Sequence, residues 1–207
     1  MRRRSFLSAA AAMPLAGFTL AAHARGYTAI DLAGAAIGPD YLLSYPDGKP
    51  ATLRDFRGKL VLLFFGFTQC PDVCPTALSR AVEIKRLLGA DGNKVQIVFA
   101  TIDPERDTGP LLRDYMAAFD PTFIAVRGTA EQTAKTAKDF KIMYRKVPSG
   151  ESYTMDHTAI TYVFDANGKI RLGLKHDQTA RQCADDLRQL INPKKSGFSE
   201  FLQGLFQ

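Results

Sequence analysis

Two nearly continuous apolar runs limit the folds open to this chain more than any other feature of its sequence. They cover residues 60–67 and 95–102 and consist mostly of large aliphatic and aromatic side chains. A strand with such a sequence is buried on both faces, as in a parallel sheet that helices cover on both sides. Residues 75–88, between the two runs, place apolar side chains along one helical stripe. The sequence therefore predicts a β-α-β unit at the centre of an α/β domain.

The rest of the chain continues this alternation of strand-like and helix-like segments. Asp165-Ala-Asn-Gly168 is a turn signal between two extended segments, and Thr129 and Gln132 have the spacing of a capping box. We expect a single domain over residues 25–192 with the order β-α-β-α-β-α-β-β-α. The further predicted strands are 41–45, 50–53, 123–126, 158–164 and 169–174, and the further helices are 110–119, 129–140 and 179–191.

Residues 1–24 have the features of an export signal. Three arginines at positions 2–4 precede an apolar stretch over residues 9–22, and Ala22-His23-Ala24 fits a cleavage site. Residues 3–7 also resemble a twin-arginine signal, so twin-arginine and Sec export both stay open, as does an uncleaved segment that tethers the protein to the inner membrane. We expect a periplasmic protein, outside the reducing cytosol, where disulfides persist.

The charge of the chain gives little reason to expect a nucleic-acid partner. The formal net charge is +6, but three of the basic residues belong to the export signal. Without residues 1–24, 24 basic residues stand against 21 acidic ones, and no basic run follows.

Residues 193–207 form a separate extension, in which five apolar side chains fall on one helical face; these are Phe198, Phe201, Leu202, Leu205 and Phe206.

The chemistry of the chain concentrates at Cys70-Pro-Asp-Val-Cys74, between a predicted buried strand and the start of a helix. The prolines after each cysteine predict that both cysteines stay outside the helix, at its N-terminus, where the helix dipole favours the thiolate. Thiolates are the soft ligands that select Cu(I) and also the nucleophiles of disulfide exchange. An inert structural disulfide is the weaker interpretation, because so small a loop gives little entropic stabilisation.

Two histidines, an aspartate and a third cysteine are the other residues whose side chains could take part in metal binding or redox chemistry. His157, just before the predicted strand 158–164, is either a metal ligand or an ordinary turn residue. Its neighbour Asp156 is placed to orient the imidazole. His176 is expected to be an exposed loop residue without a role. Cys183 shares the apolar stripe of the last helix and is expected to be a buried core residue without a redox role.

Four segments resemble the signature motifs of the Sco/SenC family. They are Asp55-Phe-Arg-Gly58, Gly66-Phe-Thr-Gln-Cys-Pro-Asp-Val-Cys-Pro-Thr76, Asp103-Pro-Glu-Arg-Asp-Thr108 and Tyr153-Thr-Met-Asp-His157. The resemblance extends over most of the chain, from about residue 37 to residue 191. The chain departs from the family pattern after Thr108, where Gly109-Pro110 replaces the usual Pro-Glu.

This resemblance implies a thioredoxin-like fold and a role in assembling cytochrome c oxidase. It also implies one copper ion, Cu(I) or Cu(II), held by Cys70, Cys74 and His157. Asp103 resembles the acidic residue that the family has near the copper. Two roles for it stay open: it tunes the charge of the thiolates, or it merely positions the turn after its strand.

Three functions fit these residues. The leading hypothesis is a copper metallochaperone for the binuclear copper centre of cytochrome c oxidase subunit II or a related copper oxidase, with other periplasmic copper chaperones or thiol reductants as further partners. The second is a thiol-disulfide reductase that keeps the cysteines of that centre reduced, although thioredoxin-type enzymes have a two-residue spacer and this chain has three residues between Cys70 and Cys74. The third, a peroxiredoxin-like peroxidase, does not need His157 as a ligand.

Overall fold

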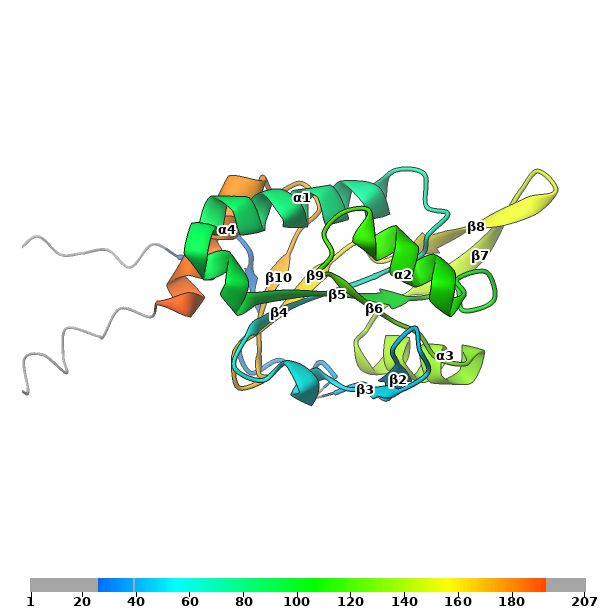
Figure 1. The fold of residues 1–207 in the computed structure, drawn as a ribbon, viewed down its shortest axis with the longest axis horizontal. Helices are drawn as coiled ribbons and strands as arrows, with labels where there is room; N and C mark the ends of the chain where they lie inside the picture. Colours follow the sequence, from blue (N-terminus) through cyan, green and yellow to red (C-terminus); the bar gives the residue numbers. More distant parts are fainter. Residues whose placement is uncertain (1–25, 39, 193–207) are drawn as a thin grey trace, which may run out of the picture.

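A central six-stranded mixed sheet organises the domain in the computed structural model, which describes residues 26–38 and 40–192. The strand order is β1-β10-β9-β4-β5-β6 (Figure 1). Strands β4, β5 and β6 are parallel, whereas β9 runs antiparallel to β4, and β10 runs antiparallel to both β9 and β1. In sheet order the bounds are Ile30–Asp31, Ile170–Leu174, Thr161–Phe164, Leu60–Gly66, Val95–Thr101 and Ile124–Val126.

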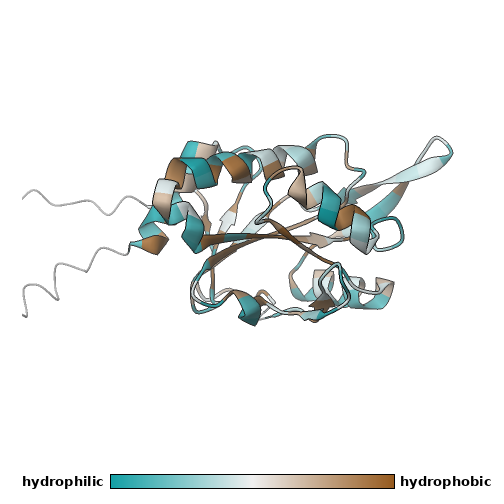
Figure 2. Ribbon diagram, viewed as in Figure 1, coloured by the Kyte–Doolittle hydropathy of each residue, from teal (hydrophilic) through white to brown (hydrophobic). Residues whose placement is uncertain are grey.

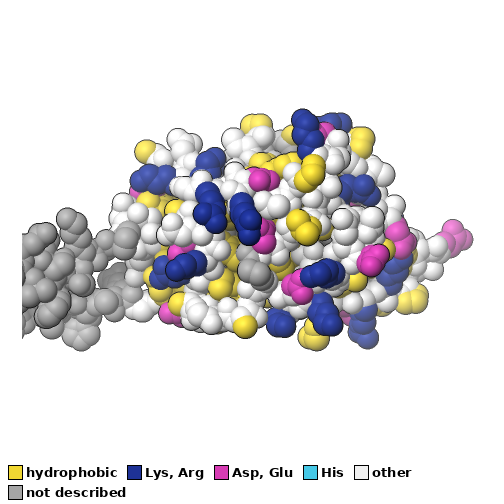
Figure 3. Space-filling model, turned by 90° about the horizontal axis from the view of Figure 1, so that it is seen from below, with side chains coloured by type: hydrophobic (Ala, Val, Ile, Leu, Met, Phe, Trp, Pro, Cys, Tyr) yellow, Lys and Arg dark blue, Asp and Glu magenta, His cyan; other side chains and the backbone are white. Residues whose placement is uncertain are grey.

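Helices cover both faces of this sheet. Helices α1 (Val73–Leu88), α2 (Gly109–Ala117) and α4 (Ala180–Ile191) lie on one side, and α3 (Ala130–Asp139) lies on the other (Figure 1). The side of α3 also carries the short hairpin of β2 (Leu43–Ser44) and β3 (Pro50–Ala51), together with a 3₁₀ turn over Leu53–Phe56. A second 3₁₀ segment, Gly89–Lys94, joins α1 to β5. On the face that carries α3, acidic side chains lie among the basic ones (Figure 3).

The two apolar runs form the centre of the sheet, as predicted. Every residue of β4 and of β5 is buried, and the sheet is the most hydrophobic layer of the molecule (Figure 2). The two strands pair in parallel along their whole length, from Leu60 opposite Val95 to Gly66 opposite Thr101. The predicted mixed sheet flanked by helices, with a hairpin of β9 and β10 near the C-terminal end, is confirmed.

A third hairpin was not predicted. Strands β7 (Tyr144–Ser149) and β8 (Ser152–His157) pair with each other and form a sheet of their own. This hairpin projects from one end of the domain, whereas both ends of the described chain lie at the opposite end (Figure 1). Its strands have few apolar residues and no regular alternation, so the sequence pattern did not reveal them. The turn residues Pro148, Ser149 and Gly150 were the signals that pointed to it, and Gly150 adopts a φ of 58° in the structure.

Candidate metal centre

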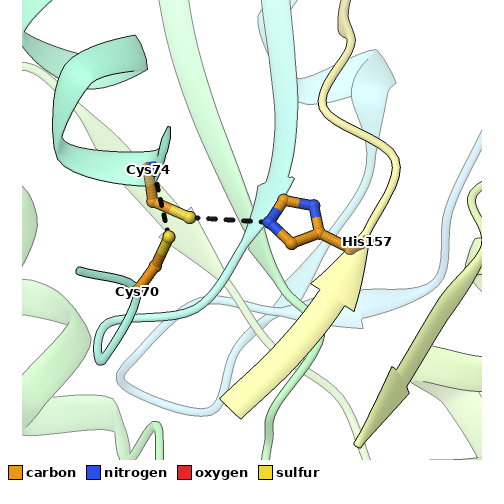
Figure 4. A group of neighbouring side chains, drawn as sticks. All are labelled: Cys70, Cys74 and His157. Carbon is orange, nitrogen blue, oxygen red and sulfur yellow. Dashed lines mark hydrogen bonds between the residues drawn. The ribbon is translucent and has the colours of Figure 1, made fainter. Parts of the chain in front are cut away.

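Two cysteines and a histidine from distant parts of the chain converge at the hairpin end of the domain. The Sγ atoms of Cys70 and Cys74 and a ring nitrogen of His157 all lie within 4.8 Å of one another (Figure 4). The Cys74 Sγ points toward the imidazole, with 3.7 Å between Sγ and Nε2. These residues are the three that the sequence analysis singled out as ligands. They are two soft sulfur donors and one imidazole, a set suited to a thiophilic metal ion such as copper.

The cysteines differ in their surroundings. Cys70 is half-buried in the loop after β4, whereas Cys74 is fully buried. Helix α1 begins at Val73, two residues earlier than predicted, so Cys74 lies in its first turn and only Cys70 stays outside the helix. The Cys74 amide donates a hydrogen bond to the Cys70 Sγ over 3.3 Å. The loop therefore folds back on itself and brings the two sulfurs together.

Burial opposes the thiolate at Cys74. The apolar surroundings raise the pKa of its thiol, and the neighbouring Cys70 acts in the same direction. The helix-terminus effect predicted from the sequence does not outweigh this desolvation. A bound cation supplies the missing charge compensation, because metal ligation deprotonates a thiol. The metal-free pocket thus favours a neutral Cys74, and a cation favours the thiolate.

The imidazole of His157 is held in one tautomer by the backbone. Its Nδ1 lies 3.1 Å from the Thr158 carbonyl oxygen, which can only accept, so Nδ1 carries the proton. This leaves the Nε2 lone pair directed at Cys74, as a metal ligand requires. Burial lowers the pKa of His157, which keeps the ring neutral. The ring also makes edge contacts with Phe64 and Phe67, each with 6.0 Å between ring centroids.

Asp156 does not orient this imidazole, contrary to expectation. Its Oδ2 pairs with Arg145 over 2.7 Å on the exposed face of the hairpin. The period of two in a strand explains the error, because neighbouring residues in β8 point to opposite faces. The Thr158 carbonyl has the role predicted for Asp156.

Asp103 lies beside the site, just beyond the end of β5, and is only 1% exposed. Its carboxylate accepts hydrogen bonds from Arg106 Nε over 2.5 Å and from the Tyr153 hydroxyl over 2.9 Å. No hydrogen bond joins it to a cysteine within the described residues. Its carboxylate thus joins Arg106, in the segment that follows β5, to Tyr153 in β8.

Asp107 and Gly66 support the cysteine loop, and the sequence analysis assigned neither a role. The buried Asp107 carboxylate accepts hydrogen bonds from the backbone amide and the hydroxyl of Thr68, two residues before Cys70. Gly66 ends β4 beneath the cysteines, and a Cβ built there would lie 2.9 Å from the Cys74 Sγ. Both residues stand inside motif segments quoted for the family resemblance, which was the available signal.

The remaining predicted residues lie away from the three donors. His176 is exposed in the loop after β10, as expected. Cys183 is fully buried in α4, and burial raises the pKa of its thiol to about 11, in keeping with the predicted core position. The predicted export signal, 1–24, and the predicted extension, 193–207, fall outside the described residues. Among the helices of the described chain, none combines the length and the apolar character needed to cross a membrane.

Fold and site together define a thioredoxin-like protein with a Cys-Cys-His cluster able to hold a metal ion. Residues 31–192 match the SCO1/SenC family, and the chain belongs to that family. A SCO2-like protein of Rickettsia felis is 39% identical over 143 residues, which cover 68% of each chain.

Two solved structures resemble the domain closely. The copper-bound structure of ScoI from Bradyrhizobium japonicum is 38% identical, with a TM-score of 0.68, over 75% of this chain and 99% of that one. Copper-bound ScoI from Arabidopsis thaliana is 28% identical, with a TM-score of 0.72, over 76% of this chain and 99% of that one.

Proposed function

We propose that this protein is a copper metallochaperone that binds one copper ion through Cys70, Cys74 and His157. The observation that carries the proposal is the convergence of these three donors within 4.8 Å. The copper in the Bradyrhizobium japonicum relative, which is 38% identical, supports the choice of metal. Zinc accepts the same donors, but three protein ligands fall short of the four that a structural zinc site uses.

The same donors suit a metal that has to be passed on. Two thiolates alone satisfy a linear Cu(I) site, whereas the imidazole extends the site to Cu(II). Cys70 is half-buried, so one donor can be reached from solvent while Cys74 stays enclosed. We propose that copper leaves by ligand exchange at Cys70 and goes to the binuclear copper centre of cytochrome c oxidase subunit II or a related copper oxidase. Other periplasmic copper chaperones or thiol reductants would load and reduce the site.

The first experiment measures copper stoichiometry and affinity on the purified chain. One copper per chain is expected. His157→Ala is expected to weaken Cu(II) binding more than Cu(I) binding, because the two thiolates remain. His176→Ala, at an exposed position away from the site, is the matched control. An unchanged Cu(II) affinity and spectrum in His157→Ala would remove His157 from the ligand set.

A thiol-disulfide reductase is the second candidate, favoured by the hydrogen bond from the Cys74 amide to the Cys70 Sγ. In such a reaction the two thiols become a disulfide, and a substrate disulfide takes up their two electrons and two protons. Complementation of an oxidase-deficient strain separates the candidates, because a reductase needs only the cysteines. If His157→Ala restores oxidase fully and Cys70→Ser does not, the metallochaperone proposal is wrong.

We further propose that the protein works in the periplasm, as a domain over residues 25–192 exported by the signal in residues 1–24. Both ends of the described chain lie at the end of the domain opposite hairpin β7–β8 (Figure 1). An uncleaved signal would therefore leave the cysteines facing away from the membrane. Fractionation of cells that produce the tagged full-length chain tests the location, and the mass of the mature protein shows whether the signal is removed.

A further inference from the structure

Arg106 joins the two parts of the chain that carry the three donors. Its Nη1 donates to the Gln69 side-chain oxygen over 2.9 Å and to the Tyr153 carbonyl oxygen over 2.7 Å. Gln69 precedes Cys70 in the cysteine loop, and Tyr153 lies in β8, the strand that ends at His157. One guanidinium therefore bridges the loop and the hairpin, although it touches none of the donor atoms.

The same guanidinium stacks on aromatic rings of both parts. It lies 3.6 Å from the ring centroid of Tyr153 and 5.9 Å from that of Phe67. Phe67 in turn contacts the His157 ring edge-on. A planar guanidinium is suited to this place because it combines hydrogen bonds in its plane with stacking on its faces, which the ammonium group of lysine does not provide.

A buried carboxylate fixes the bridge. Asp103 accepts hydrogen bonds from Arg106 Nε and from the Tyr153 hydroxyl, so it holds both halves of the stacked pair. The side chains of Asp103 and Arg106 are only 1% and 16% exposed, respectively. The Nη2 atom of Arg106 is buried and has no hydrogen-bond partner within the described residues.

Apart from these contacts and the buried Met155, hairpin β7–β8 is attached to the domain by the exposed Lys146–Glu105 ion pair and by the partly buried rings of Tyr144 and Tyr153. Its strands pair only with each other and add no strand to the central sheet. Met155 is the only buried residue in either strand. An isolated two-stranded hairpin is marginally stable in water, so its contacts with the domain decide how it lies against the cysteine loop. His157 is the last residue of β8, at the base of the hairpin opposite Tyr144.

We propose that Arg106 is a positioning residue for the metal centre, which clasps hairpin β7–β8 to the cysteine loop and so keeps His157 within reach of the sulfurs. The inference rests on the proposed copper site. It predicts that removal of the Arg106 guanidinium weakens the contribution of the imidazole to copper affinity and leaves the two thiolates in place.

The test compares Arg106→Gln with Arg145→Gln in the full chain. Arg145 lies on the same hairpin but pairs only with the exposed Asp156, so it is the matched control. In metal-free Arg106→Gln we expect faster hydrogen exchange of the β7–β8 amides. We expect Cu(II) affinity to fall about 10–100-fold, as for other residues that orient a metal ligand, with weaker nitrogen hyperfine coupling in the Cu(II) spectrum. Cu(I) affinity should change less.

Two further variants keep the proposal falsifiable if Arg106→Gln does not fold. Arg106→Lys retains the charge beside Asp103 but not the stacked plane, and should loosen the hairpin in part. Tyr153→Phe retains the stacked ring but loses the hydrogen bond to Asp103, and should loosen the hairpin less than Arg106→Gln. Hydrogen exchange and nitrogen coupling that match the wild type in both Arg106 variants would overturn the inference. If the wild type binds no copper, the proposed function fails, and hydrogen exchange still decides whether the clasp exists.

Discussion

At the scale of single residues, Gly66 shows how closely the chain is packed beneath the donors. A Cβ at this position would lie 2.8 Å from the Phe99 ring and 2.9 Å from both the Cys74 Sγ and the Phe64 ring. Real Cβ atoms do not approach other atoms so closely, so a larger residue displaces its neighbours. The backbone of Gly66 also accepts a hydrogen bond from the Ile102 amide, so the strand cannot move away freely.

Gly66→Ala should therefore disturb stability and metal binding together. Overpacking of a filled core costs about 1–3 kcal/mol, and displacement of the Cys74 Sγ should also lower copper affinity. Urea unfolding of the metal-free chain and a copper titration measure the two effects. Gly26→Ala is the control, because nothing lies within 4 Å of a Cβ at that position. Equal stability and affinity in both variants would show that the site has room to relax.

At the scale of elements, Asp107 links the ends of β4 and β5. Its carboxylate accepts hydrogen bonds from Thr68, after β4, and over 2.5 Å from the hydroxyl of Thr101, the last residue of β5. Burial raises the pKa of Asp107, and the nearby Asp103 acts in the same direction, while the hydrogen bonds from both threonines act against it. The link between the two strands is thus a carboxylate in surroundings that disfavour its charge.

This environment predicts a pH-dependent stability difference between Asp107→Asn and the wild type. A raised pKa means that the folded protein keeps the proton at pH values where the unfolded chain, with a pKa of about 3.9, has released it. The wild type should therefore lose stability relative to Asp107→Asn as pH rises through these two pKa values. Urea unfolding of both metal-free chains between about pH 4 and pH 8 gives the difference. A difference that does not vary with pH, or that varies in the opposite direction, would contradict the raised pKa.

At the scale of the whole molecule, the metal centre joins segments that the sheet leaves separate. Cys70 and Cys74 belong to the loop and helix after β4, whereas His157 belongs to a hairpin outside the central sheet. A metal ion that binds all three donors adds a cross-link that exists only in the folded chain. The site lies at the end of the domain opposite both ends of the described chain, so a partner can approach it without obstruction from them (Figure 1).

Copper should consequently stabilise the domain. A ligand at 100 times its dissociation constant adds about 2.7 kcal/mol to the free energy of unfolding, which corresponds to a rise in Tm of roughly 5–10 °C for a domain of this size. Differential scanning calorimetry with Cu(I) in the absence of oxygen measures the shift. The double variant Cys70→Ser, Cys74→Ser should show no shift. An equal Tm for the wild type with and without copper would argue against binding at this site.

Several elements could be predicted from the sequence because their signals are local. The apolar runs of β4 and β5, the capping box at Thr129 and the Asp165–Gly168 turn each depend on residues close together in the chain. The cysteine pair was likewise predicted to be a thiolate site from its flanking prolines and its place between a strand and a helix, and the family resemblance added His157 to it.

The way these parts meet could not be predicted, because it depends on contacts between residues far apart in the chain. The 3.7 Å contact between Cys74 and His157 spans 83 residues, and the bond between Arg106 and the Tyr153 carbonyl spans 47. The rule that a helix N-terminus favours a thiolate is local, and burial from distant segments overrides it at Cys74. Asp156 was mistaken because the sequence pattern did not reveal β8, the strand that turns Asp156 and His157 to opposite faces.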